Sequence, residues 1–244
     1  MRLKIVVSAI AIAIILLTIL FTDFFELELT NSESLAEKNL TASQDSELTK
    51  HPVKYSTLNA DDTNKLNFGR QAFNKEHYDV AFSELKKMVS ISSEAQFFVA
   101  KMYEQGLGVV KNPRRAIRNY SSAAEHGSID AMNALGTLFS TGVMLGKNYK
   151  EAFRWFHQAA IAGDVDAQSR IALMYKNGQG IPADIASANA WLDISCPEEI
   201  RNICSLKESF LLTPEQLKQS HLLTIKYQKL ITQSAINSSY TRIK

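Results

Sequence analysis

The fold is indicated most clearly by residues 95–127, AQFFVAKMYEQGLGVVKNPRRAIRNYSSAAEHG, because two later segments align with them without gaps. These are AMNALGTLFSTGVMLGKNYKEAFRWFHQAAIAG (131–163) and AQSRIALMYKNGQGIPADIASANAWLDISC (167–196). Each segment begins 36 residues after the previous one. Self-similarity at a fixed period of this length indicates a solenoid, in which each repeat is one supersecondary unit that buries its apolar face against its neighbours.

Small, apolar and aromatic residues recur in register across the three segments. The columns are Ala95/Ala131/Ala167, Val99/Leu135/Ile171, Ala100/Gly136/Ala172, Tyr103/Phe139/Tyr175, Gly106/Gly142/Gly178 and Ala116/Ala152/Ala188. Apolar residues at i, i+4 and i+8 predict a first helix in each repeat, and the glycine column ends it. The capping residues Asn112, Asn148 and Asp184 begin a second helix. Small residues at facing positions let the two helices approach closely.

These residues resemble the Sel-1-like repeat family, which is related to the tetratricopeptide repeat. The resemblance is strong over Ala95–Cys196 and implies three repeats over 93–196. It also implies an all-α fold, a right-handed α-solenoid of antiparallel helix hairpins. Met144 departs from the pattern where the other repeats have a second loop glycine, and so does Glu199, where they have a turn glycine. The function that the resemblance implies is protein–protein interaction.

Further helices are expected on either side of the three repeats, giving eight to ten helices over residues 61–234. Residues 61–92 look like a tetratricopeptide-type capping hairpin, with matching positions at Phe68, Gly69, Ala72, Tyr78, Ala81 and Leu85. Ser93 and Gln96 then form a capping box for the next helix.

Residues 197–234 are expected to form a C-terminal capping hairpin. Its second helix begins at a T-x-x-Q capping box, Thr213 to Gln216, with Pro214 at the first helical position. Residues 235–244 are expected to be a loose tail.

The N-terminus predicts a membrane segment. Arg2 and Lys4 precede a charge-free apolar run over residues 5–21, so we expect a signal-anchor, or transmembrane helix, within residues 1–25. The positive charges before the run place the body on the exported side. The expected location is therefore the bacterial inner membrane, single-pass, with the body in the periplasm; a cleaved signal is the alternative. Residues 26–60 are polar and predict a flexible linker.

Neither the charge nor the histidines predict nucleic acid, a metal or a cofactor. The net charge is +2 without a basic run, so no nucleic-acid partner is expected. None of the five histidines forms a recognised metal motif. Trp155 and Trp191 align with each other and are read as packing residues.

Catalysis is not expected, although one alternative remains. Ser83 and Lys86 fit S-x-x-K, the nucleophile motif of serine β-lactamases, but the S-D-N and K-T-G partners are missing from suitable places. Some cysteine-rich Sel-1-like proteins are linked to β-lactam hydrolysis, so a hydrolase is one alternative function. A peptidoglycan- or polysaccharide-binding module is another.

The candidate binding residues follow from the resemblance, because tetratricopeptide relatives line a concave groove with first-helix positions. Carried over by register, these positions are Arg70, Phe73, Glu94, Phe97, Lys101, Glu104, Asn133, Thr137, Ser169, Leu173 and Lys176. Their mixture of charges, amides and apolar anchors suits an extended peptide or a partner helix. A solvated helix face is the alternative interpretation.

Cys196 and Cys204 are the only cysteines. By themselves they could be a metal half-site, a redox pair, a disulfide or a coincidence. Cysteine-rich members of the resembled family carry the same C-x7-C spacing at this junction and bridge it. The resemblance, together with an exported body, therefore implies a disulfide.

Overall fold

The computed structural model describes residues 58–143, 146–196 and 210–243. Within these ranges there are nine α-helices and no β-strand, which confirms the all-α fold class. In chain order they are α2 (Ala60–Asn74), α3 (Tyr78–Lys87), α4 (Ser93–Gln105), α5 (Pro113–Glu125), α6 (Ile129–Thr141), α7 (Tyr149–Ile161), α8 (Val165–Asn177), α9 (Ile185–Ser195) and α11 (Pro214–Ile243).

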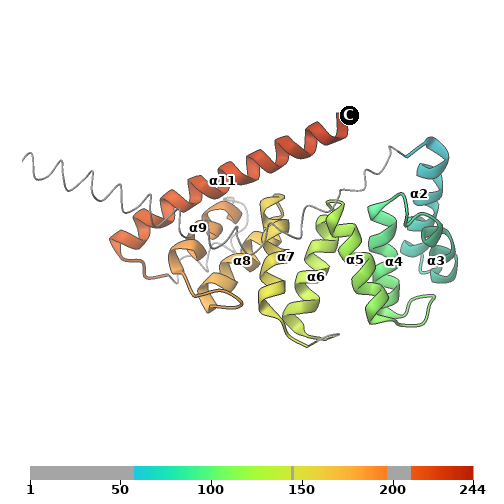
Figure 1. The fold of residues 1–244 in the computed structure, drawn as a ribbon, viewed down its shortest axis with the longest axis horizontal. Coiled ribbons are helices and arrows are strands. Elements are labelled where there is room, and N and C mark those ends of the chain that lie inside the picture. The colour runs from blue at the N-terminus through green and yellow to red at the C-terminus, as the bar shows by residue number, and fades with distance from the viewer. Residues whose placement is uncertain (1–57, 144–145, 197–209, 244) are drawn as a thin grey trace, which may run out of the picture. The chain divides into compact units, whose positions relative to one another are not determined.

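Each repeat is a helix pair that packs on the next pair along the chain. The pairs α4–α5, α6–α7 and α8–α9 are the three repeats, and α2–α3 precedes them as the expected N-terminal hairpin (Figure 1). The second helix of each pair also contacts the first helix of the next, as α3 with α4 and α5 with α6. The helices therefore stack as consecutive hairpins, as the repeat predicts.

The predicted caps of the second helices are confirmed. Asn112 and Asn148 each accept a hydrogen bond from the backbone N–H three residues on, and Asp184 accepts two, from Ala186 and Ser187. The T-x-x-Q box also forms, because the Thr213 N–H donates to the Gln216 side chain at 3.0 Å and the Gln216 N–H donates to Thr213 Oγ1 at 3.2 Å. Each cap satisfies backbone donors that have no partner inside the helix.

The predicted cap of α4 is wrong by one residue. Ser92, not Ser93, has the extended backbone of an N-cap and accepts from the Ala95 N–H. The Gln96 amide, expected to complete the box, instead donates to the Val89 carbonyl at 2.7 Å. Two consecutive serines made the position ambiguous, and the turn that ends α3 decides it.

The glycines after the first helices have two distinct roles. Gly106, Gly142 and Gly178 end α4, α6 and α8 in the left-handed conformation. Two further loop glycines contact the preceding hairpin: a Cβ on Gly108 would lie 2.4 Å from the Tyr78 carbonyl, and one on Gly180 would lie 2.3 Å from the Tyr149 oxygen. These loops therefore approach the start of the previous second helix too closely for any side chain.

The core consists of the small-residue columns found in the sequence. The alanines of the columns at 95, 116 and their counterparts are 0% exposed in all three repeats. Gly136 replaces an alanine in another of these columns, and a Cβ there would lie 2.6 Å from the ring of Phe156 on α7. Trp155 and Trp191 are buried, which confirms them as packing residues.

The N-terminal hairpin differs from expectation at one position. Gly69, Ala72, Ala81 and Leu85 are buried as the tetratricopeptide pattern predicts, but Phe68 is 55% exposed. Phe68 lies among polar side chains of α2, and no further hairpin covers it in the described residues.

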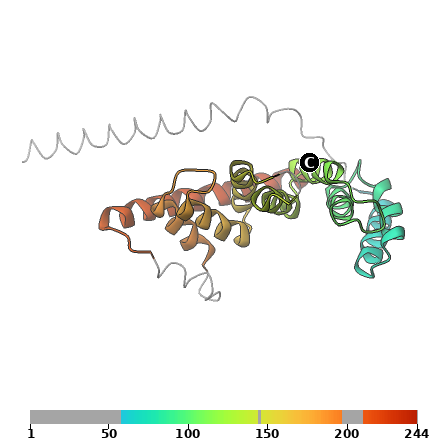
Figure 2. The same ribbon diagram turned by 90° about the horizontal axis from the view of Figure 1, so that it is seen from below.

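The C-terminal helix is longer than predicted. α11 continues to Ile243, so the loose tail expected over 235–244 is instead helical almost to its end. No glycine or proline interrupts residues 215–243, and nothing there stops the helix. α11 lies along α9 and also contacts α7 (Figures 1 and 2).

Three expectations lie outside the described residues. They are the N-terminal membrane segment with most of the linker, the first helix of the C-terminal hairpin, and Cys204. The disulfide between Cys196 and Cys204 thus stays a prediction. Among the described helices, none combines the length and apolar character needed to cross a membrane.

We predict that Gly136→Val lowers the free energy of unfolding by about 2–3 kcal/mol, because the new side chain overlaps the Phe156 ring in a filled core. Urea unfolding followed by circular dichroism measures the change. Thr137→Val, at the exposed next position of the same helix, is the control and should cost well under 1 kcal/mol. Equal losses in both variants would contradict the close packing.

Candidate functional site

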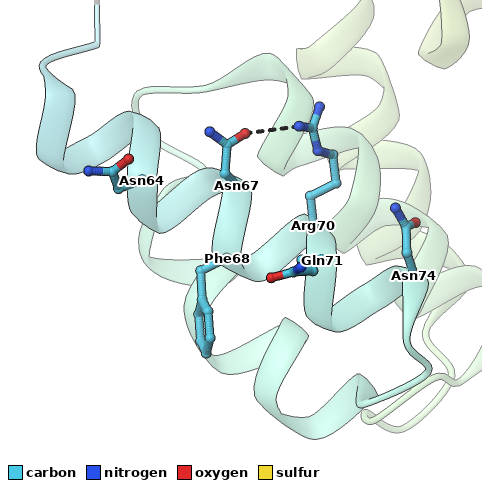
Figure 3. Close-up of a pocket in the computed structure, with 6 residues that line it drawn as sticks. All are labelled: Asn64, Asn67, Phe68, Arg70, Gln71 and Asn74. Carbon is cyan, nitrogen blue, oxygen red and sulfur yellow. Dashed lines mark hydrogen bonds between the residues drawn. The ribbon is translucent and has the colours of Figure 1, made fainter.

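A shallow hollow on α2 is lined by polar side chains and one exposed ring. Figure 3 shows the lining residues, which are Asn64, Asn67, Phe68, Arg70, Gln71 and Asn74. The four amides follow one another at helical spacing, which places them along one side of α2. Each amide offers both a hydrogen-bond donor and an acceptor. The hollow can therefore pair with peptide groups.

Arg70 connects this hollow to the next repeat. One guanidinium nitrogen donates to Asn67 Oδ1 at 2.9 Å (Figure 3), and the other donates to Glu94 Oε1 at 3.2 Å. Arg70 and Glu94 were both predicted from the sequence as binding residues, and the structure brings them into contact between α2 and α4. Both side chains stay more than two-fifths exposed.

Aromatic rings lie beside this ion pair. Phe73 packs on Phe98 with ring centroids 5.0 Å apart, and Phe98 meets Phe97 at 5.5 Å. The ammonium of Lys101 lies 5.5 Å above the Phe73 ring. All four side chains are half-buried, so each presents part of its surface to solvent.

Five of the predicted binding residues lie on α2 and α4, in this ion pair and in this cluster of rings, and we call them together the α2–α4 face. It consists of Arg70, Phe73, Glu94, Phe97 and Lys101.

Glu104, also predicted, is directed toward α5 instead. It accepts a 2.7 Å hydrogen bond from the Tyr120 hydroxyl. Burial raises the pKa of Tyr120 well above its usual range, and the Glu104 carboxylate raises it further. The pair holds α4 against α5, so Glu104 has a structural role in addition to any contact with a partner.

The remaining predicted residues are spread over α6 and α8. Thr137 is exposed, Leu173 is 39% exposed, and the Ser169 hydroxyl is satisfied by the Val165 carbonyl at 3.0 Å. Asn133 is half-buried, and its buried Oδ1 has no hydrogen-bond partner. The ammonium of Lys176 lies 4.8 Å from the Phe210 ring centroid, next to the segment that leads into α11.

The sequence reasoning missed four residues of the hollow: Asn64, Asn67, Phe68 and Gln71. The three amides among them could have been found from the sequence, because amides recur at i, i+3, i+7 and i+10 along α2. Phe68 is not part of that pattern. Alignment with the tetratricopeptide relatives selects one row of positions along each first helix, and these residues lie beside that row.

The S-x-x-K residues show no shared geometry in the structure. Ser83 and Lys86 are exposed on α3, and the Lys86 ammonium lies 5.5 Å above the Phe82 ring. No hydrogen bond joins the two side chains among the described contacts, so the lysine is not placed as a base for the serine.

His157 lies among aromatic rings at the contact between α7 and α9. Its ring stacks on Phe153 at 5.5 Å and meets Trp191 edge-on at 5.9 Å. Burial lowers the pKa of His157 to about 4. In the residues that the structure describes, no three potential metal ligands cluster. His157 is thus a neutral packing residue.

The comparisons with known proteins match the helix pairs. The Sel1 repeat family matches residues 93–128, 129–164 and 165–196, which are α4–α5, α6–α7 and α8–α9 with their turns. The comparison with curated proteins gives no match.

The solved structures that are similar to this chain include two repeat proteins. A Sel1 repeat protein from Oxalobacter formigenes is 27% identical, with a TM-score of 0.49, over 52% of this chain and 97% of its own. A protective antigen present in uropathogenic Escherichia coli strains, which displays an SLR fold, is 21% identical with a TM-score of 0.41. That match covers 73% of this chain and 48% of the antigen, so it spans about half of the antigen's length.

We predict that the pKa of His157 makes stability pH-dependent. The unfolded chain binds a proton near pH 6.5, whereas the folded chain does so only near pH 4. Stability is therefore full above pH 6.5 and falls as the pH drops toward 4. Between pH 7 and pH 5 the loss should be about 2 kcal/mol by urea unfolding.

Variants separate this effect from other titrating groups. His157→Phe should remove about 2 kcal/mol of the pH difference, whereas His221→Gln, at an exposed position, should leave it unchanged. An unaltered pH difference in His157→Phe would contradict the assignment.

Proposed function

Residues 93–196 of this chain are three Sel1 repeats, and from this we propose that the protein is a scaffold that binds a protein partner through its α2–α4 face. Sel1 repeats generally serve as protein–protein interaction scaffolds. The observation that carries the proposal is the grouping of two rings, a cation and an ion pair on one partly exposed surface between α2 and α4.

The chemistry of the face suits a peptide segment. Phe73 and Phe97 are held in place by Phe98, so an apolar side chain can pack on them with little loss of rotamer freedom. Lys101 and Arg70 offer charge to an acidic side chain, although Arg70 already pairs with Glu94. A partner carrying an apolar anchor next to an acidic residue fits this arrangement best.

The amides beside the face extend the contact. Asn64, Gln71 and Asn74 line the hollow on α2, and none of their side chains has a hydrogen bond to another part of the protein among the described contacts. An extended backbone presents alternating N–H and C=O groups, which such amides can satisfy in pairs. The partner segment is therefore proposed to run over the hollow as an extended peptide.

We also propose that the scaffold is exported. The support is the charge-free apolar run over residues 5–21 preceded by Arg2 and Lys4, which is typical of a signal-anchor with its body on the outer side of the inner membrane. The partner would then be a periplasmic or envelope protein, and the Cys196–Cys204 pair would be in an oxidising compartment.

We predict that a photo-crosslinking amino acid at Phe97 or Lys101 captures one defined protein in intact cells, because both positions lie on the α2–α4 face. The same group at Val110, which is 86% exposed in the loop after α4, is the matched control and should capture nothing specific. Mass spectrometry of the crosslinked band identifies the partner. Capture from Val110 but not from Phe97 or Lys101 would overturn the proposed face.

We predict that protein isolated from cells without reductant contains no free thiol, because export oxidises the Cys196–Cys204 pair. Alkylation followed by intact-mass spectrometry counts the modified cysteines. The Cys204→Ser variant should lower the free energy of unfolding by roughly 2–3 kcal/mol, because it lacks the bridge that closes a short loop. Two alkylated cysteines in the wild-type protein would contradict the exported location.

A further inference from the structure

One side of α11 is firmly attached to the last repeat. The Tyr227 ring stacks on Trp191 with centroids 4.5 Å apart, and Asn189 donates to the Ser220 hydroxyl at 2.9 Å. Ser220 and Tyr227 are buried in this contact, while the fully buried residues of α9 lie beneath it. The stack and the hydrogen bond fix which side of α11 faces away from the repeats.

The opposite side of α11 carries a second regular pattern. Exposed residues recur there at alternating spacings of four and three, the spacing of a coiled-coil seam. They are Lys218, Leu222, Ile225, Lys229, Thr232 and Ile236, which we call the outer seam. Every member is exposed, whereas Ser220 and Tyr227, on the attached side, are buried.

Among the described helices, α11, which carries the outer seam, has the most exposed large apolar side chains. Five of the eleven exposed large apolar side chains lie on α11: Leu217, Leu222, Ile225, Leu230 and Ile236. A helix attached by one side normally confines its apolar residues to that side. Because α11 has apolar residues on both sides, we expect a second partner to pack on the side that faces away from α9.

A hollow lies at one end of the outer seam. Leucines at 217 and 222 line it together with polar and charged side chains; the full lining is Asp193 of α9 and Pro214, Leu217, Lys218, Ser220, His221 and Leu222 of α11. A side chain of a bound helix can enter there beside Leu222, which gives the seam a defined end.

The charge of α11 selects the partner. Over its described side chains, residues 214–238, α11 has Lys218, Lys226 and Lys229 but only one acidic residue, Glu215, in its first turn. Lys218 and Lys229 lie within the seam itself, so a helix that covers it must supply acidic groups to both. We propose that the outer seam binds an amphipathic helix of a partner protein, with an apolar stripe flanked by glutamate or aspartate.

Two other occupants fit less well. A second copy of the chain would bring lysines into the seam without opposing acids, which destabilises the pairing. A membrane surface favours helices whose lysines lie beside an apolar face, whereas Lys229 lies between Ile225 and Ile236 within it. The interrupted seam instead resembles a coiled-coil position where a lysine specifies the partner.

The test uses the full-length chain in nanodiscs of neutral lipid and two fluorescent synthetic peptides, each three heptads long. Both peptides carry leucine at the a and d positions; one has glutamate and the other lysine at e and g. Fluorescence anisotropy should show the glutamate peptide binding at least about tenfold more tightly than the lysine peptide. Leu222→Ser with Ile225→Ser should weaken the glutamate peptide at least about tenfold.

Charge reversal supplies a gain as well as a loss. Lys218→Glu with Lys229→Glu should invert the preference toward the lysine peptide. Lys75→Glu with Lys111→Glu changes the net charge equally at exposed positions away from α11, and it should leave both affinities unchanged. Near-UV circular dichroism of the Trp191–Tyr227 stack shows that α11 remains attached in each variant.

Three results would overturn this inference. The first is that the glutamate peptide binds the Leu222→Ser/Ile225→Ser variant with the same affinity as the wild type. The second is that the chain self-associates and that this variant abolishes the self-association. The third is that neither peptide binds, while anionic phosphatidylglycerol vesicles bind in a way that depends on the seam. The α2–α4 face lies on other helices, so crosslinking from Phe97 can succeed or fail independently of the seam.

Discussion

Close contact between small side chains is the constraint on which the structure depends. Three buried columns of the repeats consist of alanine, except that the middle repeat has Gly136 in one of them, where the ring of Phe156 fills the space that a Cβ would take. Because little side-chain volume separates the helices, the backbone itself sets their spacing. Any larger residue in a column must move a whole helix, and the repeats must keep the same register from one to the next.

This packing determines which side chains remain exposed for binding. Residues that the columns bury cannot bind, so the binding chemistry lies on the first-helix positions that the columns leave outside, such as Phe73 and Lys101. At the C-terminal end of the three repeats, α11 covers α9 through Tyr227. The same helix then presents its other side to solvent, so the cap of the fold is also a candidate surface for a partner.

Much of the fold could be predicted from the sequence, because repeats report packing directly. A column of alanine or glycine recurring at a fixed period identifies buried positions, and Asn112 or Thr213 marks a helix start through local hydrogen bonds. The errors have a different origin. The cap at Ser92 depends on the preceding turn. Phe68 is exposed because no described helix lies beyond α2. The length of α11 depends on the absence of a stop signal. Of the candidate site, register selected Arg70 and Glu94 as binding residues, but neither their contact nor the amide hollow was predicted.

Hydrogen–deuterium exchange of the full-length protein tests most directly whether neighbouring repeats hold each helix in place. The account predicts that amides of α6 and α7, with repeats on both sides, exchange most slowly, and that α2 and α3 exchange faster. It also predicts that α9 is protected nearly as well as α7, because α11 covers it. Protection in α2 and α3 equal to that of α6 and α7, or exchange in α9 as fast as in α2, would contradict it.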